Sequence, residues 1–287
     1  MLYRPYSHMA IVSHCITIMV LLLILSAPSM AGQRQKLIIT HDANYEPLVY
    51  KDEQGLPQGY LIDFWKHFGE ANNIDISFKL GSWEESMDWV RNGQADVHAG
   101  LFFTMERATF LDFGEPITGL SAAIYITKGL TWNDFLSRPI GVVKGGYAEF
   151  FMQTVWSSRQ VKSFPQARDM IQAAVAGKIK AFIADQPIAV FYLREFKGQD
   201  LLLKYEETYS SQLRVATAKG RNDLNALLHQ GWARMDVKKL NYIRGKWFLD
   251  VGHDNKWILT GVLVTALIIF IGLLFRILGQ KYPPLQE

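Results

Sequence analysis

The chain has 287 residues, enough for one large domain or two small ones with a sizeable core. Its net charge of +3 is small and its lysines and arginines are scattered, which argues against a nucleic-acid partner. Because 13% of the residues are aromatic and no tract is of low complexity, the composition excludes extensive disorder.

An apolar leader at residues 1–31 is the first predicted segment. Arg4 precedes an uncharged stretch that is most apolar at Ile16–Leu25, and Ser29–Ala31 puts small residues at positions −3 and −1 of a cleavage site. This is the layout of a secretory signal peptide; an uncleaved N-terminal anchor is the alternative, because the apolar stretch is long. The single cysteine, Cys15, lies inside the leader, so the mature chain would contain no disulfide.

Residues 36–250 alternate between short strands and amphipathic helices, which predicts an α/β domain. In its first half, strands are expected at Lys36–Thr40, Ile74–Leu80 and Ala95–Leu101. A helix is expected after Gly59, because apolar residues recur at helical spacing on one face: Leu61, Phe64, Trp65, Phe68 and Ala71. Ser82 and Glu85 have the spacing of a capping box and predict a second helix that ends at Asn92-Gly93.

The second half repeats this alternation. Strands are expected at Pro139–Val143, Ala181–Ala184 and Leu213–Thr217. Helices are expected after Gly145-Gly146, between Pro165 and Gly177, from Pro187 onward, and at Asp223–Met235 and Val237–Trp247. The helix after Gly146 carries Tyr147, Phe150, Phe151 and Val155.

A second uncharged apolar segment, Trp257–Phe275, follows the domain. At 1.5 Å per residue it is long enough to cross a bilayer core of about 30 Å, which predicts a transmembrane helix. Arg276 and Lys281 follow it, as expected for a short cytoplasmic tail at 276–287. A buried core helix is the alternative, although such helices rarely lack a polar face over this length.

Several short motifs occur in a fixed order along the domain. They are Tyr45–Tyr50 with Gly59–Asp63, Gly93–Val97, Thr104–Arg107 with Leu111–Phe113, Ile140–Gly145 and Gly177–Asp185. Each is weak alone, but together, over Lys36 to Phe248, they resemble the bacterial extracellular solute-binding protein family 3, which has the type 2 periplasmic binding protein fold.

The resemblance implies a solute-binding domain at 32–250 with two α/β lobes that close over a small ligand. Lobe 1 would hold about 36–119 and 206–250, and lobe 2 about 120–205. The candidate hinges are Gly119–Ile126 and the stretch before Leu213. Hinge closure of this kind is driven by ligand binding. No cofactor is expected from the sequence, and no metal, because its seven histidines form no metal-spaced pair.

Two charged residues are the first candidates for ligand contact, because the family commonly binds amino acids. Arg107 would pair with a carboxylate through its planar guanidinium, next to the turn that begins at Thr104. A structural or exposed arginine is the alternative. Asp185 ends a strand at the family's ammonium-binding position. Its alternative role is to cap the helix that Pro187 begins.

Aromatic residues complete the candidate site. Tyr45 and Trp83 match positions where the family places rings over the ligand, and Asp42 is a further candidate, although aromatic residues more often fill cores. Phe102 and Tyr147 stand where the family often has small or hydroxyl residues. These two rings are expected to narrow the cleft, make it more apolar, or favour closure, so the ligand need not be an amino acid.

Three functions are compatible with these features. The predicted anchor favours a sensor of the inner membrane with its binding domain in the periplasm, and Val97–Phe103 looks like the periplasmic portions of membrane-bound diguanylate cyclases and histidine kinases. A tethered component that delivers solute to an ABC permease is the second. The third is a dehydratase-type enzyme on the same fold, for which the sequence offers no acid–base pair.

Overall fold

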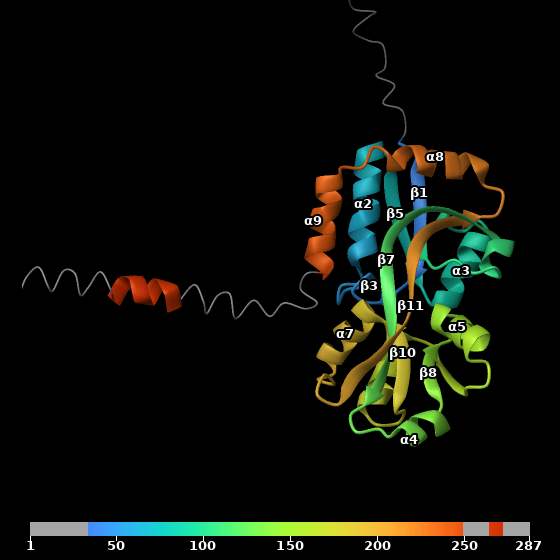
Figure 1. The fold of residues 1–287 in the computed structure, drawn as a ribbon. Coiled ribbons are helices and arrows are strands. Elements are labelled where there is room, and N and C mark those ends of the chain that lie inside the picture. The colour runs from blue at the N-terminus through green and yellow to red at the C-terminus, as the bar shows by residue number, and fades with distance from the viewer. Residues whose placement is uncertain (1–33, 249–263, 272–287) are drawn as a thin grey trace, which may run out of the picture. The chain divides into compact units, whose positions relative to one another are not determined.

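The computed structural model describes residues 34–248 and 264–271 (Figure 1). The predicted leader at 1–31 lies outside the described residues. So does most of the predicted transmembrane segment, of which residues 264–271 are seen as a helix. Among the residues that the structure describes, no helix is long and apolar enough to span a bilayer.

One mixed sheet of eight strands runs through the domain. In spatial order its strands are β5 (Asp75–Gly81), β1 (Lys36–Asp42), β6 (Val97–Leu101), β11 (Leu202–Ala218), β7 (Leu111–Thr127), β10 (Ala181–Asp185), β8 (Ile140–Val143) and β9 (Val161–Phe164). A small antiparallel sheet holds β2 (Asn44–Tyr45), β3 (Val49–Lys51) and β4 (Pro57–Gln58).

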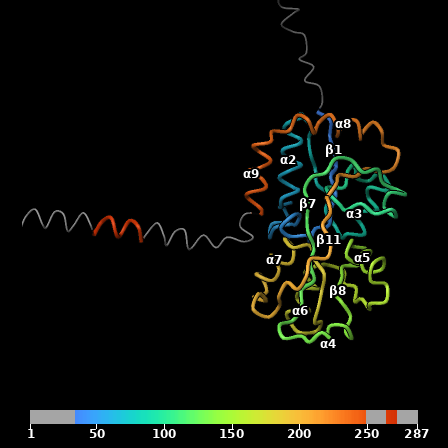
Figure 2. Tube along the Cα trace, in the orientation of Figure 1, coloured from blue at the N-terminus to red at the C-terminus, as the bar shows by residue number. Residues whose placement is uncertain are grey.

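The two long strands β7 and β11 belong to both halves of the sheet. They pair antiparallel along their length, from Leu202 opposite Thr127 to Ala218 opposite Leu111, and the register shifts at several points. One half of β11 also pairs with β6, whereas the opposite half of β7 pairs with β10. The strands therefore pass between two α/β lobes (Figure 2), and the predicted hinge segments lie within them.

Lobe 1 carries α2 (Tyr60–Asn72), α3 (Trp83–Arg91), α8 (Asn222–Trp232) and α9 (Val237–Phe248). The predicted apolar face of α2 is buried at Leu61, Phe64, Trp65 and Phe68. The predicted capping box of α3 is present, with Ser82 and Glu85 bonded to each other's backbone N–H groups. α9 lies beside α2 (Figure 1), where Lys246 and Trp247 both donate to Asp63.

Lobe 2 carries α4 (Trp132–Ser137), α5 (Tyr147–Val155), α6 (Ala167–Val175) and α7 (Gln186–Glu195). The inward face predicted for α6 is buried at Ala167, Met170, Ile171 and Ala174. On α5, the apolar Val155 is 56% exposed, because it lies at the C-terminal end of the helix. The two-lobed α/β fold that the sequence predicts is confirmed.

The strand prediction at Leu213–Thr217 was wrong in extent, because β11 begins at Leu202. β9, the small sheet and α4 were not predicted, and β7 was anticipated only as a crossover hinge at Gly119–Ile126. The first part of β11 is charged and exposed, so it has no apolar alternation, and β7 contains Pro116, which normally disfavours a strand. The register shift between Leu213 and Arg214, opposite Pro116, accommodates that proline.

Candidate functional site

A cavity of about 80 Å³ lies between the lobes. Seven of the eight predicted site residues line it: Asp42, Tyr45, Trp83, Phe102, Arg107, Tyr147 and Asp185. The eighth, Thr104, lines a neighbouring groove and accepts a hydrogen bond from the backbone N–H of Arg107 at 3.1 Å. His41, Asn44 and Tyr209 also line the cavity and were not predicted from the sequence.

Asp185 reaches the cavity from the end of β10. Tyr45 of lobe 1 donates its hydroxyl to Oδ2 of Asp185 at 2.5 Å, which joins the two lobes. The other oxygen, Oδ1, is shielded from solvent and is the single buried side-chain N or O atom in the described residues that has no hydrogen-bond partner. Burial raises the pKa of Asp185 to about 6. Asp185 occupies the N-cap position of α7, as the alternative role predicted, but its side chain makes no capping hydrogen bond.

Arg107 faces the cavity from lobe 1 and is 7% exposed. Its Nη1 donates to the carbonyl of Phe102 at 2.7 Å, and its Nη2 donates to the carbonyl of Gly145 in lobe 2 at 3.0 Å. The guanidinium carbon lies 5.1 Å from the centre of the Trp83 ring. Burial lowers the pKa of Arg107 to about 10, which leaves the side chain charged at neutral pH. A guanidinium has five N–H donors, so donors remain for an anionic group.

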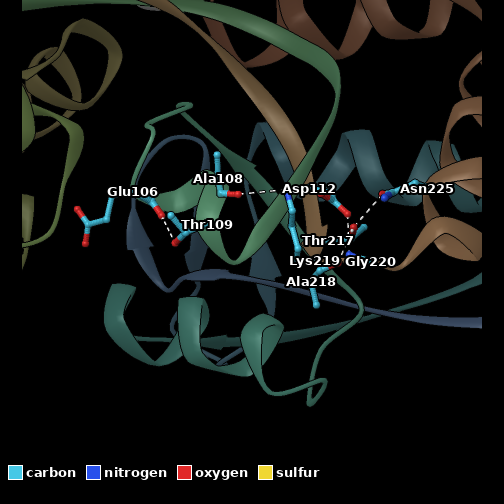
Figure 3. Close-up of polar contacts among 9 residues, drawn as sticks. All are labelled: Glu106, Ala108, Thr109, Asp112, Thr217, Ala218, Lys219, Gly220 and Asn225. Carbon is cyan, nitrogen blue, oxygen red and sulfur yellow. Dashed lines mark hydrogen bonds and ion pairs between the residues drawn. The ribbon is translucent and has the colours of Figure 1, made fainter.

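Hydrogen bonds hold the turn that carries Arg107, and Figure 3 shows those made by its neighbours Glu106, Ala108 and Thr109. Thr109 donates to the carbonyl of Glu106 at 2.6 Å, and Lys219, just after β11, donates to the carbonyl of Ala108 at 3.1 Å. Asp112 accepts from the backbone N–H of Gly220 at 2.7 Å. These contacts tie the short 3₁₀ helix at Arg107–Thr109 to the end of a crossover strand.

Aromatic rings surround the two charged groups. His41 stacks on Tyr45 with ring centres 5.2 Å apart. His98 also packs on His41, with ring centres 4.9 Å apart. Burial lowers the pKa of His41 to about 4, so the ring is neutral at physiological pH. The indole N–H of Trp83 donates to the carbonyl of Gly145 at 3.1 Å.

A second aromatic group also lines the cavity. Phe102 and Tyr147 meet edge to face with centres 5.1 Å apart, and Tyr209 of β11 lies 4.8 Å from Tyr147. The two residues that the sequence singles out as departures from the family therefore meet each other across the lobes. No sequence signal pointed to Tyr209, because the predicted strand began only at Leu213, after this residue.

Two further acidic groups lie at this interface. Asp42 accepts from the backbone N–H of Asn44 at 3.0 Å, and burial raises its pKa to about 6. Glu46 accepts a short hydrogen bond from the buried hydroxyl of Tyr192 on α7. Burial also raises the pKa of Glu46. In residues 34–248 and 264–271, no group of His, Cys, Asp or Glu residues is arranged to hold a metal ion.

Two lobes joined by two crossover strands, with opposite charges facing a cavity between them, define a solute-binding domain of the periplasmic type. Residues 37–250 match the model of the bacterial extracellular solute-binding proteins, family 3. The chain belongs to this family.

Among curated proteins, the L-cystine-binding protein TcyJ of Escherichia coli K12 is 24% identical over 225 residues, which is 75% of this chain and 84% of that protein. The virulence sensor protein BvgS of Bordetella pertussis (strain Tohama I) is 22% identical over 179 residues, or 61% of this chain and 14% of BvgS.

Solved structures share the fold. A histidine kinase sensor domain with similarity to periplasmic binding proteins superposes with a TM-score of 0.69 at 21% identity, covering 75% of this chain and 96% of that one. An ancestral arginine-binding protein bound to arginine superposes with a TM-score of 0.68 at 24% identity. The match covers 75% of this chain and 99% of that one.

Proposed function

We propose that this chain is a membrane-anchored periplasmic sensor that captures a small ligand bearing an ammonium group, with amino acids as the first candidates. The observation that carries the proposal is the unpartnered Oδ1 of Asp185, whose residue lines the same cavity as Arg107. An amino acid has one group for each: an ammonium for Asp185 and a carboxylate for Arg107.

The energetics of the buried carboxylate favour such a ligand. A buried acceptor without a donor costs about 1–3 kcal/mol, and more when it is charged. An ammonium group would donate to Oδ1 and lower this cost, and the faces of Tyr45 and Tyr209 would add cation–π contacts. Because Tyr45 and Asp185 belong to different lobes, a cation held there would stabilise the lobes in contact.

Three features support a sensing role. The curated relatives include a sensor protein, and a solved neighbour is a kinase sensor domain. The last helix of the domain, α9, precedes the predicted transmembrane segment. Tyr60 on α2 is influenced by Thr118, just before the predicted hinge segment of β7, and by Arg244 on α9, and its ring packs on Phe248 at the end of α9. A conformational change at the hinge would therefore be transmitted to α9, the helix that precedes the predicted transmembrane segment.

A thermal-shift screen of residues 32–255 tests ligand capture, because all three cores of the domain lie within this range. Amino acids, polyamines and carboxylates form the panel. A true ligand at a hundredfold excess over Kd is expected to stabilise the domain by about 2.7 kcal/mol. Arg107→Ala should abolish any shift that depends on the ligand carboxylate, while Arg138→Ala, at an exposed arginine of lobe 2, should retain it. An unchanged shift in Arg107→Ala would refute its role.

Delivery to an ABC importer is the second candidate, since relatives such as TcyJ are named as binding proteins. Permease genes beside this one would favour import, whereas an adjacent cyclase or kinase gene would favour sensing. An enzyme on this fold would convert the ligand identified in the screen, which product analysis of the incubated mixture would detect.

A further inference from the structure

One wall of the cavity is built from three rings that come from different parts of the fold. Phe102 directly follows β6 of lobe 1, Tyr147 begins α5 in lobe 2, and Tyr209 lies in the crossover strand β11. Their centres are 4.8 to 6.2 Å apart, in edge-to-face contact. Phe151 packs on Tyr209 at 5.2 Å, and Phe150 lies 5.7 Å from Tyr147. The rings are thus supported and cannot swing away freely.

Gly145 lies next to the cavity and binds two of the residues that line it. Its carbonyl accepts from both Trp83 and Arg107, at 3.1 and 3.0 Å. Beyond this contact lies a separate groove of about 510 Å³, which shares Trp83, Arg107 and Gly146 with the cavity and is lined further by Lys144. Gly145 has a φ of +68°, which a residue with a side chain rarely adopts. Gly145 lines only the outer groove and Gly146 lines both spaces, so this turn lies at the boundary between the inner cavity and the larger outer groove.

The space that remains inside is small. The cavity volume of about 80 Å³ is well below the roughly 300–1,000 Å³ of ordinary small-molecule pockets. Glycine and alanine are the smallest amino acids, whereas lysine, arginine and cystine have roughly twice as many non-hydrogen atoms or more.

We propose that the Phe102–Tyr147–Tyr209 wall makes the site selective for small amines, and that Tyr147 is a specificity-determining residue. The inference rests on the proposed function, since it assumes an ammonium at Asp185. A longer ligand anchored there would meet the aromatic wall or push Gly145 outward. In the second case both hydrogen bonds to the Gly145 carbonyl are lost, so closure and binding weaken together.

The test uses the full chain in detergent and isothermal titration with glycine, alanine, lysine and arginine, and with straight-chain alkylamines of increasing length. Binding is expected to weaken by at least about tenfold for each methylene beyond the length that fits. Tyr147→Ala should lower the Kd of longer ligands and flatten this dependence. Phe150→Ala is the matched control, because Phe150 contacts Tyr147 but lines the outer groove rather than the cavity.

The possible outcomes separate a failure of the size limit from a failure of the proposed function. If lysine or arginine binds as tightly as alanine to the wild-type chain, the size limit is wrong while the proposed function stands. If no amine of any length binds, both are wrong. Should Tyr147→Ala fail to fold, Phe102→Val removes volume from the same wall and is expected to relax the length dependence. A length dependence that survives both substitutions unchanged overturns the role of the wall.

Discussion

Replacing Asp185 by asparagine is expected to stabilise the ligand-free domain at neutral pH while it abolishes ligand binding. Asparagine has nearly the same shape and keeps a carbonyl oxygen that accepts from Tyr45. It removes the buried negative charge and presents an amide N–H₂, which repels an ammonium donor. Stability and function should therefore change in opposite directions at this position, as they do at sites that store an unfavourable interaction for binding.

The magnitude follows from the pKa of Asp185, which burial raises from 3.8 to about 6. Because the pKa is higher in the folded protein, the folded state holds this proton more tightly than the unfolded state does. This group's effect on stability is therefore most favourable below pH 4 and is lost as the pH rises through 6. A difference of about two pKa units corresponds to about 3 kcal/mol at pH 7, which is the upper bound for the gain, since opening of the lobes also rehydrates the charge.

Urea denaturation of residues 32–255 measures this gain. At pH 7, Asp185→Asn should exceed wild type by up to about 3 kcal/mol in free energy of unfolding, and the difference should shrink toward pH 4. Asp200→Asn, at an exposed carboxylate, should change stability by no more than about 0.5 kcal/mol at either pH. If Asp185→Asn is less stable than wild type at pH 7, the carboxylate is not held unfavourably and the argument for a cationic ligand loses its basis.

Three further substitutions probe the contacts between and beside the lobes. Tyr192→Phe removes the donor to buried Glu46 and should cost about 1–3 kcal/mol in urea denaturation. Trp83→Phe keeps a ring but removes the N–H that binds the carbonyl of Gly145, so stopped-flow measurements should show faster ligand release. Ser82→Ala removes the cap of α3 and should cost about 1 kcal/mol, seen by circular dichroism as a Tm lower by about 2–4 °C.

The sequence predicted those elements whose local pattern agrees with their place in the fold. The apolar face of α2 and the capping box of α3 can both be recognised within one short window, because helical spacing and end signals are local. The crossover strands β7 and β11 cannot be recognised within such a window. Leu202 pairs with Thr127, far away in the sequence, and the first part of β11 is exposed and charged. Its strand conformation comes from pairing with β7 rather than from its own side chains.

The candidate site, too, was predictable only in part: its lining residues could be selected from the sequence, but their contacts could not. Motif order was enough to select seven of the residues that line the cavity, because the family's loops follow its strands in a fixed sequence. It was not enough to predict how they contact one another. The bond from Tyr45 to Asp185 joins residues 140 positions apart, and it depends on the angle between the lobes. Tyr209 was missed because the predicted strand began only at Leu213, after this residue.

The unequal environment of the two carboxylate oxygens of Asp185 explains how binding and closure are coupled. Oδ2 receives the Tyr45 hydroxyl from the other lobe, whereas Oδ1 receives nothing from the described residues. A ligand can shift the balance between open and closed lobes only by its difference in affinity for the two states. An ammonium at Oδ1 meets this condition, because it relieves the charge that closure buries without displacing Tyr45. A neutral or anionic ligand leaves that charge uncompensated, so the closed state itself selects for cations.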